Sequence, residues 1–237
     1  MNKDDFIQYL VFSVKKLQVI RKHFEDYPLH TRKRADFELW IKAFELIQNK
    51  EHLTAPGIQK IVAIKASLNL GIPDELKAAF PTIVPVERPN VENIINPDPH
   101  WLAGFTSAEG SFFIHIYKAN TKLGVAVKLI FKLDQHVRDE QLFKDLVKYL
   151  GCGKIYFDRE VVVYWVTKYS DILEKIIPFF KKYPIIGVKA LDFNDFSQVA
   201  ELMKDNKHLT QQGLDQIRKI KTSMNQGRKS FDLQASH

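Results

Sequence analysis

One acidic side chain stands where simple electrostatics would not place it. Residues 101–110 (WLAGFTSAEG) follow a helix-start signal, because Asp98 can cap free backbone N–H groups and Pro99 suits the first turn. Gly110 is expected to take the left-handed conformation that ends a helix, which makes Glu109 the last helical residue. A carboxylate there lies at the negative end of the helix dipole and costs about 0.3–1 kcal/mol. We expect a cation to compensate it; a solvated glutamate ending a buried helix fits the spacing equally well.

Small side chains gather on one sector of the same helix. Residues four apart on a helix share a face, and small ones let a second backbone approach closely. The pattern therefore predicts packing against a partner helix through Ala103, Gly104, Ser107 and Ala108. The bulkier Trp101, Leu102 and Phe105 are expected on the other side.

Composition restricts the class of protein. A net charge of +7 and a pI near 9.3 favour a polyanionic partner, with nucleic acid preferred over a merely solvated basic surface. No apolar run has membrane-spanning length and no signal peptide opens the chain, so we expect a soluble protein without a membrane partner. The single cysteine, Cys152, excludes an intramolecular disulfide and is expected to be a buried or turn residue rather than a nucleophile.

The chain contains an ungapped internal repeat. Aligning Tyr27 with Tyr183, 156 residues apart, gives 17 identities over the 45 positions that end at Gly71 and Gly227. This match indicates two copies of one unit. Both copies are predicted to end in a helix capped by Thr54 or Thr210. Their core stripes are Ile58, Ile61, Ile64, Leu68 and Leu214, Ile217, Ile220, Met224.

The repeat predicts the domain organisation. Residues 72–97 carry five prolines, so they are expected to form an extended linker without regular elements. Residues 98–228 read as a complete second repeat and 229–237 as a tail. Residues 1–71 read as a partial first repeat whose 6–12 segment is its last strand, with about 55 preceding residues missing.

Alternating strands follow the acidic helix. Residues 111–118 and 124–133 have one apolar face each, and a helix at 137–150 and a second strand pair, 154–157 and 161–168, come next. The order of helix, two strands, helix, two strands and then helices predicts an α+β fold with antiparallel sheets and helices on one face. The other face is basic and aromatic and suits the DNA major groove, unless it is simply solvated. Its predicted DNA-binding residues are Ser111, Phe113, His115, Tyr117, Lys128, Ile130, Lys132, Lys154, Tyr156 and Lys168.

With these residues placed, the chain resembles the LAGLIDADG homing endonucleases of the two-repeat monomeric type found in organellar introns. Residues 102–110 (LAGFTSAEG) follow the name-giving motif, and the strand order, the segment YLGCG at 149–153 and the repeated HLT helices strengthen the resemblance. It implies tandem αββαββα repeats whose motif helices pack side by side and whose curved sheets lie along double-stranded DNA.

The resemblance also implies a chemistry. The acid at the end of each motif helix binds a divalent metal, usually Mg²⁺, which activates water against a phosphodiester. Glu109 takes that role here, and the repeated pair Lys189 and Lys33 are candidate catalytic lysines, although surface lysines kept from the duplication would look the same. Lys168, at a strand end, is a further basic candidate.

The chain departs from the family pattern in one respect: the family has two motif helices, and residues 1–97 do not supply the second one. A single carboxylate leaves a hard divalent ion short of oxygen ligands. We expect a truncated or mis-started copy of a longer reading frame, with a decayed relic or a helix supplied in trans as the alternatives. The competing function is an intron maturase that binds intron RNA without using Glu109, and a third possibility is an inert fragment. A mitochondrial location follows from the resemblance alone.

Overall fold

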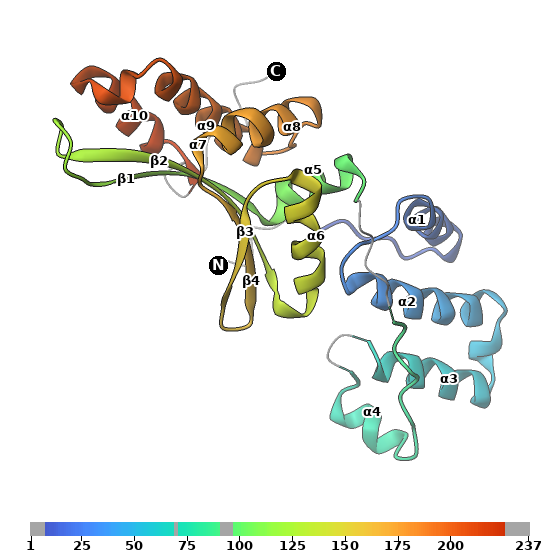
Figure 1. Cartoon of the computed structure of the whole chain (residues 1–237). Coiled ribbons are helices and arrows are strands. Elements are labelled where there is room, and N and C mark those ends of the chain that lie inside the picture. Colours follow the sequence, from blue (N-terminus) through green and yellow to red (C-terminus); the bar gives the residue numbers. More distant parts are fainter. Residues whose placement is uncertain (1–7, 69–70, 91–96, 226–237) are drawn as a thin grey trace. The chain divides into compact units, whose positions relative to one another are not determined.

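The computed structural model describes residues 8–68, 71–90 and 97–225. The chain divides into two compact units, Met1–Asn93 and Ile94–His237 (Figure 1). The predicted linker of residues 72–97 falls across this division, and the predicted tail of 229–237 lies outside the described residues. None of the described helices is long and apolar enough to cross a membrane.

The second unit contains a four-stranded antiparallel sheet. Helix α5 (Pro99–Glu109) leads directly into β1 (Gly110–Lys118) and β2 (Val125–His136). The short η2 (Val137–Asp139) and α6 (Glu140–Leu150) precede β3 (Lys154–Asp158) and β4 (Val161–Val166). The strand order is β1-β2-β4-β3. Left-handed Gly151 and Gly153 make the turn into β3. The α+β class and the predicted element order are confirmed.

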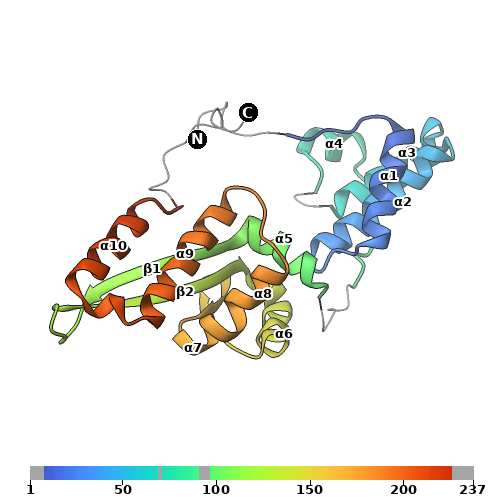
Figure 2. The same ribbon diagram turned by 90° about the horizontal axis from the view of Figure 1, so that it is seen from above.

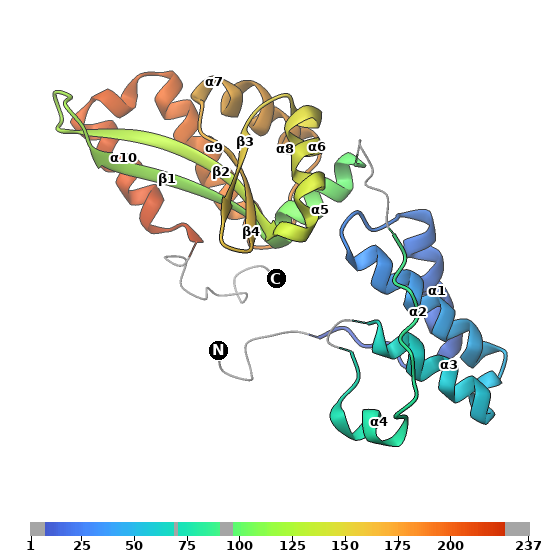
Figure 3. The same cartoon turned by 60° about the horizontal axis from the view of Figure 1, so that its bottom comes forward.

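Helices cover one face of this sheet. They are α7 (Tyr169–Asp171), the π-helical η3 (Ile172–Ile176), α8 (Ile177–Lys182), α9 (Lys189–Lys204), η4 (Lys207–Leu209) and α10 (Gln211–Thr222). Helices α8 to α10 lie over β1 and β2 (Figure 2), and Figure 3 views the sheet from its opposite face. The core between sheet and helices holds the side chains predicted from strand alternation, including Phe112, Leu129, Phe131 and Leu133 at 0–1% exposure.

The first unit is helical in its described part. It consists of α1 (Val14–Asp26), α2 (Lys33–Gln48), η1 (Glu51–Leu53), α3 (Ala55–Ala66) and α4 (Asp74–Ala79). Leu39 and Phe44 of α2 and Val62 and Ile64 of α3 are buried together in its small core. Arg88 ties the segment after α4 to this core, because its guanidinium donates to Asp36 at 2.7 Å and to the Ser67 carbonyl at 2.8 Å.

The sequence repeat folds into the same elements twice. Helices α2 and α9, the turns η1 and η4, and helices α3 and α10 are each offset by 156 residues at both ends. Lys50 and Asn206, also 156 apart, both take left-handed φ angles of 61° and 57°. Both threonine caps are confirmed: Thr54 accepts from Gly57 N–H and Thr210 from Gly213 N–H.

Three expectations for the first unit are wrong. Residues 8–12 of the predicted strand have no regular structure, and Tyr9 and Phe12 are more than 80% exposed; the rest of that segment, Phe6 and Ile7, lies outside the described residues. A strand needs a neighbour to pair with, and the described part of this unit contains none. The proline-rich segment does form a regular element, α4, because Pro73 precedes a run of good helix formers. Ile58, predicted in the core, is 38% exposed.

Candidate functional site

Glu109 ends the helix that the sequence predicts. The Asp98 carboxylate caps α5 by accepting from His100 N–H at 2.8 Å and Trp101 N–H at 3.2 Å. Leu102, with 0% exposure, fixes the buried side of the helix in the core, and Glu109 is left exposed at its last turn. No described cation forms an ion pair with this carboxylate, so the expected compensation does not come from the described protein residues.

Gly110 follows Glu109 for a reason other than the predicted one. Its φ of −76° and ψ of 155° are extended, so the expected left-handed helix end is wrong. A Cβ at this position would lie 2.5 Å from the Thr106 carbonyl oxygen and 2.5 Å from its methyl carbon. The chain passes straight from helix into β1, and only glycine fits against the last helical turn. This tight junction places Glu109 two residues before Ser111, the first β1 residue on the open sheet face, because Gly110 itself is on the buried face.

The small residues of α5 divide between two environments. Ala103 is 3% exposed in the core of its own unit, so its prediction as a partner-helix contact is wrong. Gly104 and Ala108 are exposed, and a Cβ on Gly104 would meet nothing within 4 Å. Ser107 donates to the Ala103 carbonyl at 2.8 Å and accepts from Ile186 N–H at 3.2 Å. Only the strip of Gly104 and Ala108 therefore stays open to another backbone.

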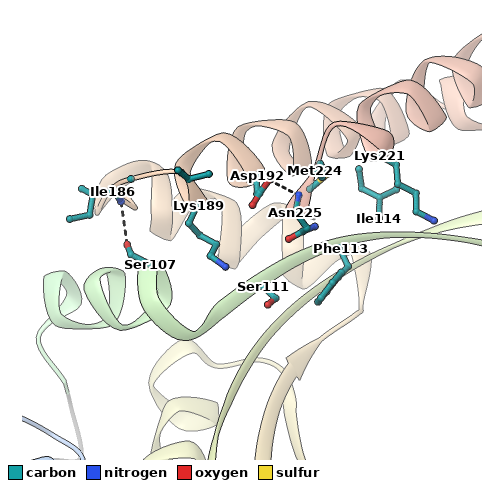
Figure 4. A pocket seen from close by; sticks show the side chains of 12 residues that line it. Ser107, Ser111, Phe113, Ile114, Ile186, Lys189, Asp192, Lys221, Met224 and Asn225 are labelled. Atoms are coloured by element: carbon teal, nitrogen blue, oxygen red, sulfur yellow. Dashed lines mark hydrogen bonds between the residues drawn. The ribbon is translucent and has the colours of Figure 1, made fainter. Parts of the chain in front are cut away.

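Lys189 lies beside the same helix end. It is the first residue of α9, three residues after the Ile186 amide that Ser107 holds. Lys189 lines an open pocket of about 860 Å³ together with Ser107, Ser111 and Asn225. In Figure 4 its side chain points from α9 toward Ser111 at the start of β1. The predicted counterpart, Lys33, is likewise the first residue of α2 and is exposed, but it belongs to the other unit.

The open face of the sheet carries nearly all of the predicted nucleic-acid contacts. The register places Ser111 opposite Lys132, Phe113 opposite Ile130, and His115 opposite Lys128. Tyr117, Lys154 and Tyr156 are exposed on the same face. Lys168 is the exception: β4 ends at Val166, and Lys168 stands outside the sheet at the start of α7.

Sequence reasoning missed two residues of this face. Trp165 lies between Lys132 and Lys154, its partners on the two neighbouring strands, and the Lys154 ammonium is 5.3 Å from its ring centre. Asp134 lies on the next outward position of β2 after Lys132. The run VVVYWV is apolar at every position, so its alternation could not show which side chains face outward.

Asn225 was also missed. It donates its side-chain N–H to the Phe112 carbonyl at 3.0 Å and its backbone N–H to Asp192 at 3.0 Å, which joins the end of α10 to β1 and α9 (Figure 4). The signal that could have found it is its repetition: asparagine stands at both Asn69 and Asn225.

Cys152 is the buried turn residue that the sequence predicts. Burial raises the pKa of its thiol, so the sulfur stays protonated near neutral pH. Tyr164 donates to the Cys152 carbonyl at 2.9 Å. This cluster supports the turn between α6 and β3 and supplies no nucleophile.

The described residues fit a divalent metal only in part. A hard cation takes several oxygen ligands, and the exposed carboxylate of Glu109 offers one such group. No cluster of three or more His, Cys, Asp or Glu side chains occurs among the described residues. Glu109 can therefore serve as one ligand, but this part of the chain does not complete a coordination shell.

The fold and the site together define a class. A helix ending in an exposed carboxylate, followed at once by an antiparallel sheet with a basic and aromatic open face, is the architecture of a homing-endonuclease repeat. Residues 1–44 and 102–200 match the family described as LAGLIDADG endonuclease. The chain belongs to the LAGLIDADG endonuclease family.

Curated relatives and solved structures support the same family. "Probable intron-encoded endonuclease 3" of Neurospora crassa is 42% identical over 90% of this chain and 40% of its own length. "Probable intron-encoded endonuclease 2" of the same fungus is 37% identical over 94% of this chain and 51% of its own. This chain thus spans about half or less of these curated relatives. The LAGLIDADG homing endonuclease I-SmaMI bound to cleaved DNA matches with a TM-score of 0.89 at 46% identity, covering 91% of this chain and 73% of that one. I-SmaMI has also been solved on its uncleaved DNA target in the presence of calcium ions.

Proposed function

We propose that this chain acts in site-specific cleavage of double-stranded DNA, either by itself or as part of a longer homing endonuclease. The observation that carries the proposal is the direct junction between α5 and β1, which leaves the exposed Glu109 two residues before Ser111 on the open sheet face. A DNA backbone lying along that face would pass the carboxylate. The family and the DNA-bound neighbours support the same function.

The roles of the residues follow from their chemistry. A two-stranded ribbon such as β1 and β2 fits the major groove, where its lysines reach phosphates and base edges. Glu109 would supply one ligand to Mg²⁺ or another divalent ion, which, when bound, lowers the pKa of water and polarises phosphate oxygens. Lys189 would neutralise charge on the phosphate near the helix end, and Lys33 would do so in a second half-site. The structure of I-SmaMI on uncleaved DNA in the presence of calcium ions supports the metal.

The exposed strip of Gly104 and Ala108 would receive a second motif helix, from the same polypeptide or from another one. That helix would bring the second carboxylate that a metal between two phosphates needs. Its support here is the open space at Gly104, where the backbone is accessible. The proposal of a mitochondrial origin is supported by the intron-encoded names of the Neurospora relatives.

A plasmid-library assay tests the proposed function. The chain is incubated with Mg²⁺ and a supercoiled library of random target sequences, and the cut plasmids are sequenced. The proposal predicts nicked or linear product enriched in one target sequence. A chain that binds no duplex and cuts no plasmid would refute it.

Filter binding distinguishes the proposed DNA endonuclease from the maturase alternative. The same basic face would serve RNA, so the chain is titrated with folded intron RNA and with duplex DNA, each with and without Mg²⁺. The proposal predicts tighter binding to its DNA target. Binding to RNA alone, indifferent to Mg²⁺, would favour the maturase.

A further inference from the structure

The lysines on the open sheet face differ in how firmly the protein holds them. The Lys132 ammonium forms an ion pair of 2.6 Å with Asp134 and lies 5.6 Å from the ring centre of Phe113. Trp165 lies opposite Lys132 on β4, and the Lys132 side chain is only 28% exposed. Lys128, four residues earlier on the same face, has no ion-pair partner among the residues that the structure describes.

This difference separates two kinds of DNA contact. Phosphates can be reached from many directions, so a mobile lysine serves them well. A base edge presents its acceptors in a fixed geometry, and a donor that is already held in place binds it with a smaller loss of conformational freedom. Lys132 meets the second requirement, because its ion pair with Asp134 and its position over the Phe113 ring restrict it.

The presence of Asp134 on this face also supports a base contact for Lys132. A carboxylate on a surface that faces phosphates is repelled by them, so it would weaken a face that served only to bind the backbone. Its Oδ2 holds Lys132, while its Oδ1 is buried with no hydrogen-bond partner among the described residues. One carboxylate oxygen of Asp134 is thus buried in the sheet face beside Lys132, although the side chain as a whole is 34% exposed.

We propose that Lys132 and Asp134 form a base-reading pair. Lys132 donates to N7 and O6 of a guanine in the major groove, and Asp134 positions the ammonium for that contact. Lys128 contacts phosphate and carries no sequence information. The inference rests on the proposed function, in which this face lies in the major groove of duplex DNA.

A binding selection on a randomised duplex library, without divalent metal, tests the pair. The proteins are the wild-type chain, Asp134→Asn, Lys132→Met, the double variant and Lys128→Met. Loss of either partner is expected to reduce discrimination for one G·C pair about tenfold or more, at the same position in both variants. The double variant should lose little beyond either single variant, because the two residues act as one unit.

The charge changes provide the control. Asp134→Asn removes a negative charge, so its binding to unselected duplex should stay equal or rise while specificity falls. Lys128→Met should weaken all sequences alike and reduce the slope of log affinity against log salt by about 0.9. Circular dichroism and thermal unfolding of each variant confirm that the sheet is intact.

The outcomes separate the two claims. A wild-type chain that selects no duplex sequence contradicts the proposed function, and the base-reading pair fails with it. Selection by the wild type with an unchanged preference in Asp134→Asn and Lys132→Met contradicts only the pair. A preference that changes in Lys132→Met but not in Asp134→Asn contradicts the positioning role of Asp134.

Discussion

At the scale of single residues, Ser107 links the two groups proposed to act on DNA. It lies two residues before Glu109, and its hydroxyl accepts the Ile186 N–H three residues before Lys189. The hydroxyl also donates to Ala103 within α5. One side chain therefore fixes the distance between the acidic helix end and the basic start of α9.

Replacing this hydroxyl has a measurable cost. Ser107→Ala leaves the Ile186 amide without its acceptor, and we expect the free energy of unfolding to fall by about 1 kcal/mol in chemical denaturation. Ser197→Ala is the matched control, because the Ser197 hydroxyl is buried without a described partner. That variant should be as stable as the wild type or slightly more stable. Equal losses in both variants would show that the Ser107 bonds contribute nothing.

The residues around Glu109 also show where sequence reasoning holds and where it fails. The Asp98 cap, the proline in the first turn and the last helical position of Glu109 were predictable because they depend on local backbone chemistry. The reason for Gly110 was not, since a glycine fits a left-handed turn and a close approach equally well. The contact with Thr106 decides between them, and it exists only in the folded junction.

At the scale of elements, strand faces were more predictable than helix faces. Successive side chains of a strand point to opposite faces, so the apolar alternation in β1 and β2 assigns each residue to one face. Phe112 and Ile114 are buried, and Phe113 and His115 lie on the open face, as expected. Helix α5 is made of small and apolar residues all round. Alanine suits a core and an interface alike, which is why Ala103 was assigned to the wrong side.

The open side of α5 can be tested by Gly104→Ala. Glycine in a helix interior costs about 1 kcal/mol relative to alanine, and the added methyl group meets nothing within 4 Å. We expect greater stability of the second unit in chemical denaturation. If a second motif helix docks here, the same change should reduce plasmid cleavage. Unchanged cleavage would place the partner helix elsewhere.

The turn before α10 makes stability depend on pH. Burial lowers the pKa of the His208 imidazole from its ordinary value of 6.5, because the charged ring is poorly solvated there. The unfolded chain then binds its proton at higher pH than the folded chain. The free energy of unfolding should be constant above about pH 6.5 and fall as the pH drops below it. His208→Asn should flatten this dependence; an identical pH profile in the variant would contradict the assignment.

At the scale of the whole molecule, the two units differ in what they bury. The second unit has a sheet and helices around one core, whereas helix α1 of the first unit has no buried residue. Amide hydrogen exchange should therefore be fastest in α1 and slowest in β1, β2 and β4. Equal protection in α1 and the sheet would show that α1 is covered by something outside the described residues.

The internal sequence repeat predicted part of the domain organisation correctly and part of it wrongly. The offset of 156 residues predicted the paired helices and caps correctly, because copies of one sequence form the same local structure. It also assigned a strand to residues 6–12, and residues 8–12 of it are irregular. Strand formation depends on partners far away in the chain, and the described first unit offers no sheet to join.

The central claim is that Glu109 holds a metal ion against DNA lying on the open sheet face. Its most direct test is the rate of plasmid cleavage in Mg²⁺ by Glu109→Gln, with Glu160→Gln as the control at an exposed acid on the β3–β4 turn. We expect Glu109→Gln to bind target duplex as tightly as the wild-type chain but to cut it about 10³-fold more slowly or not at all. Glu160→Gln should cut at the wild-type rate. Equal cleavage by the wild-type chain and Glu109→Gln would contradict the claim.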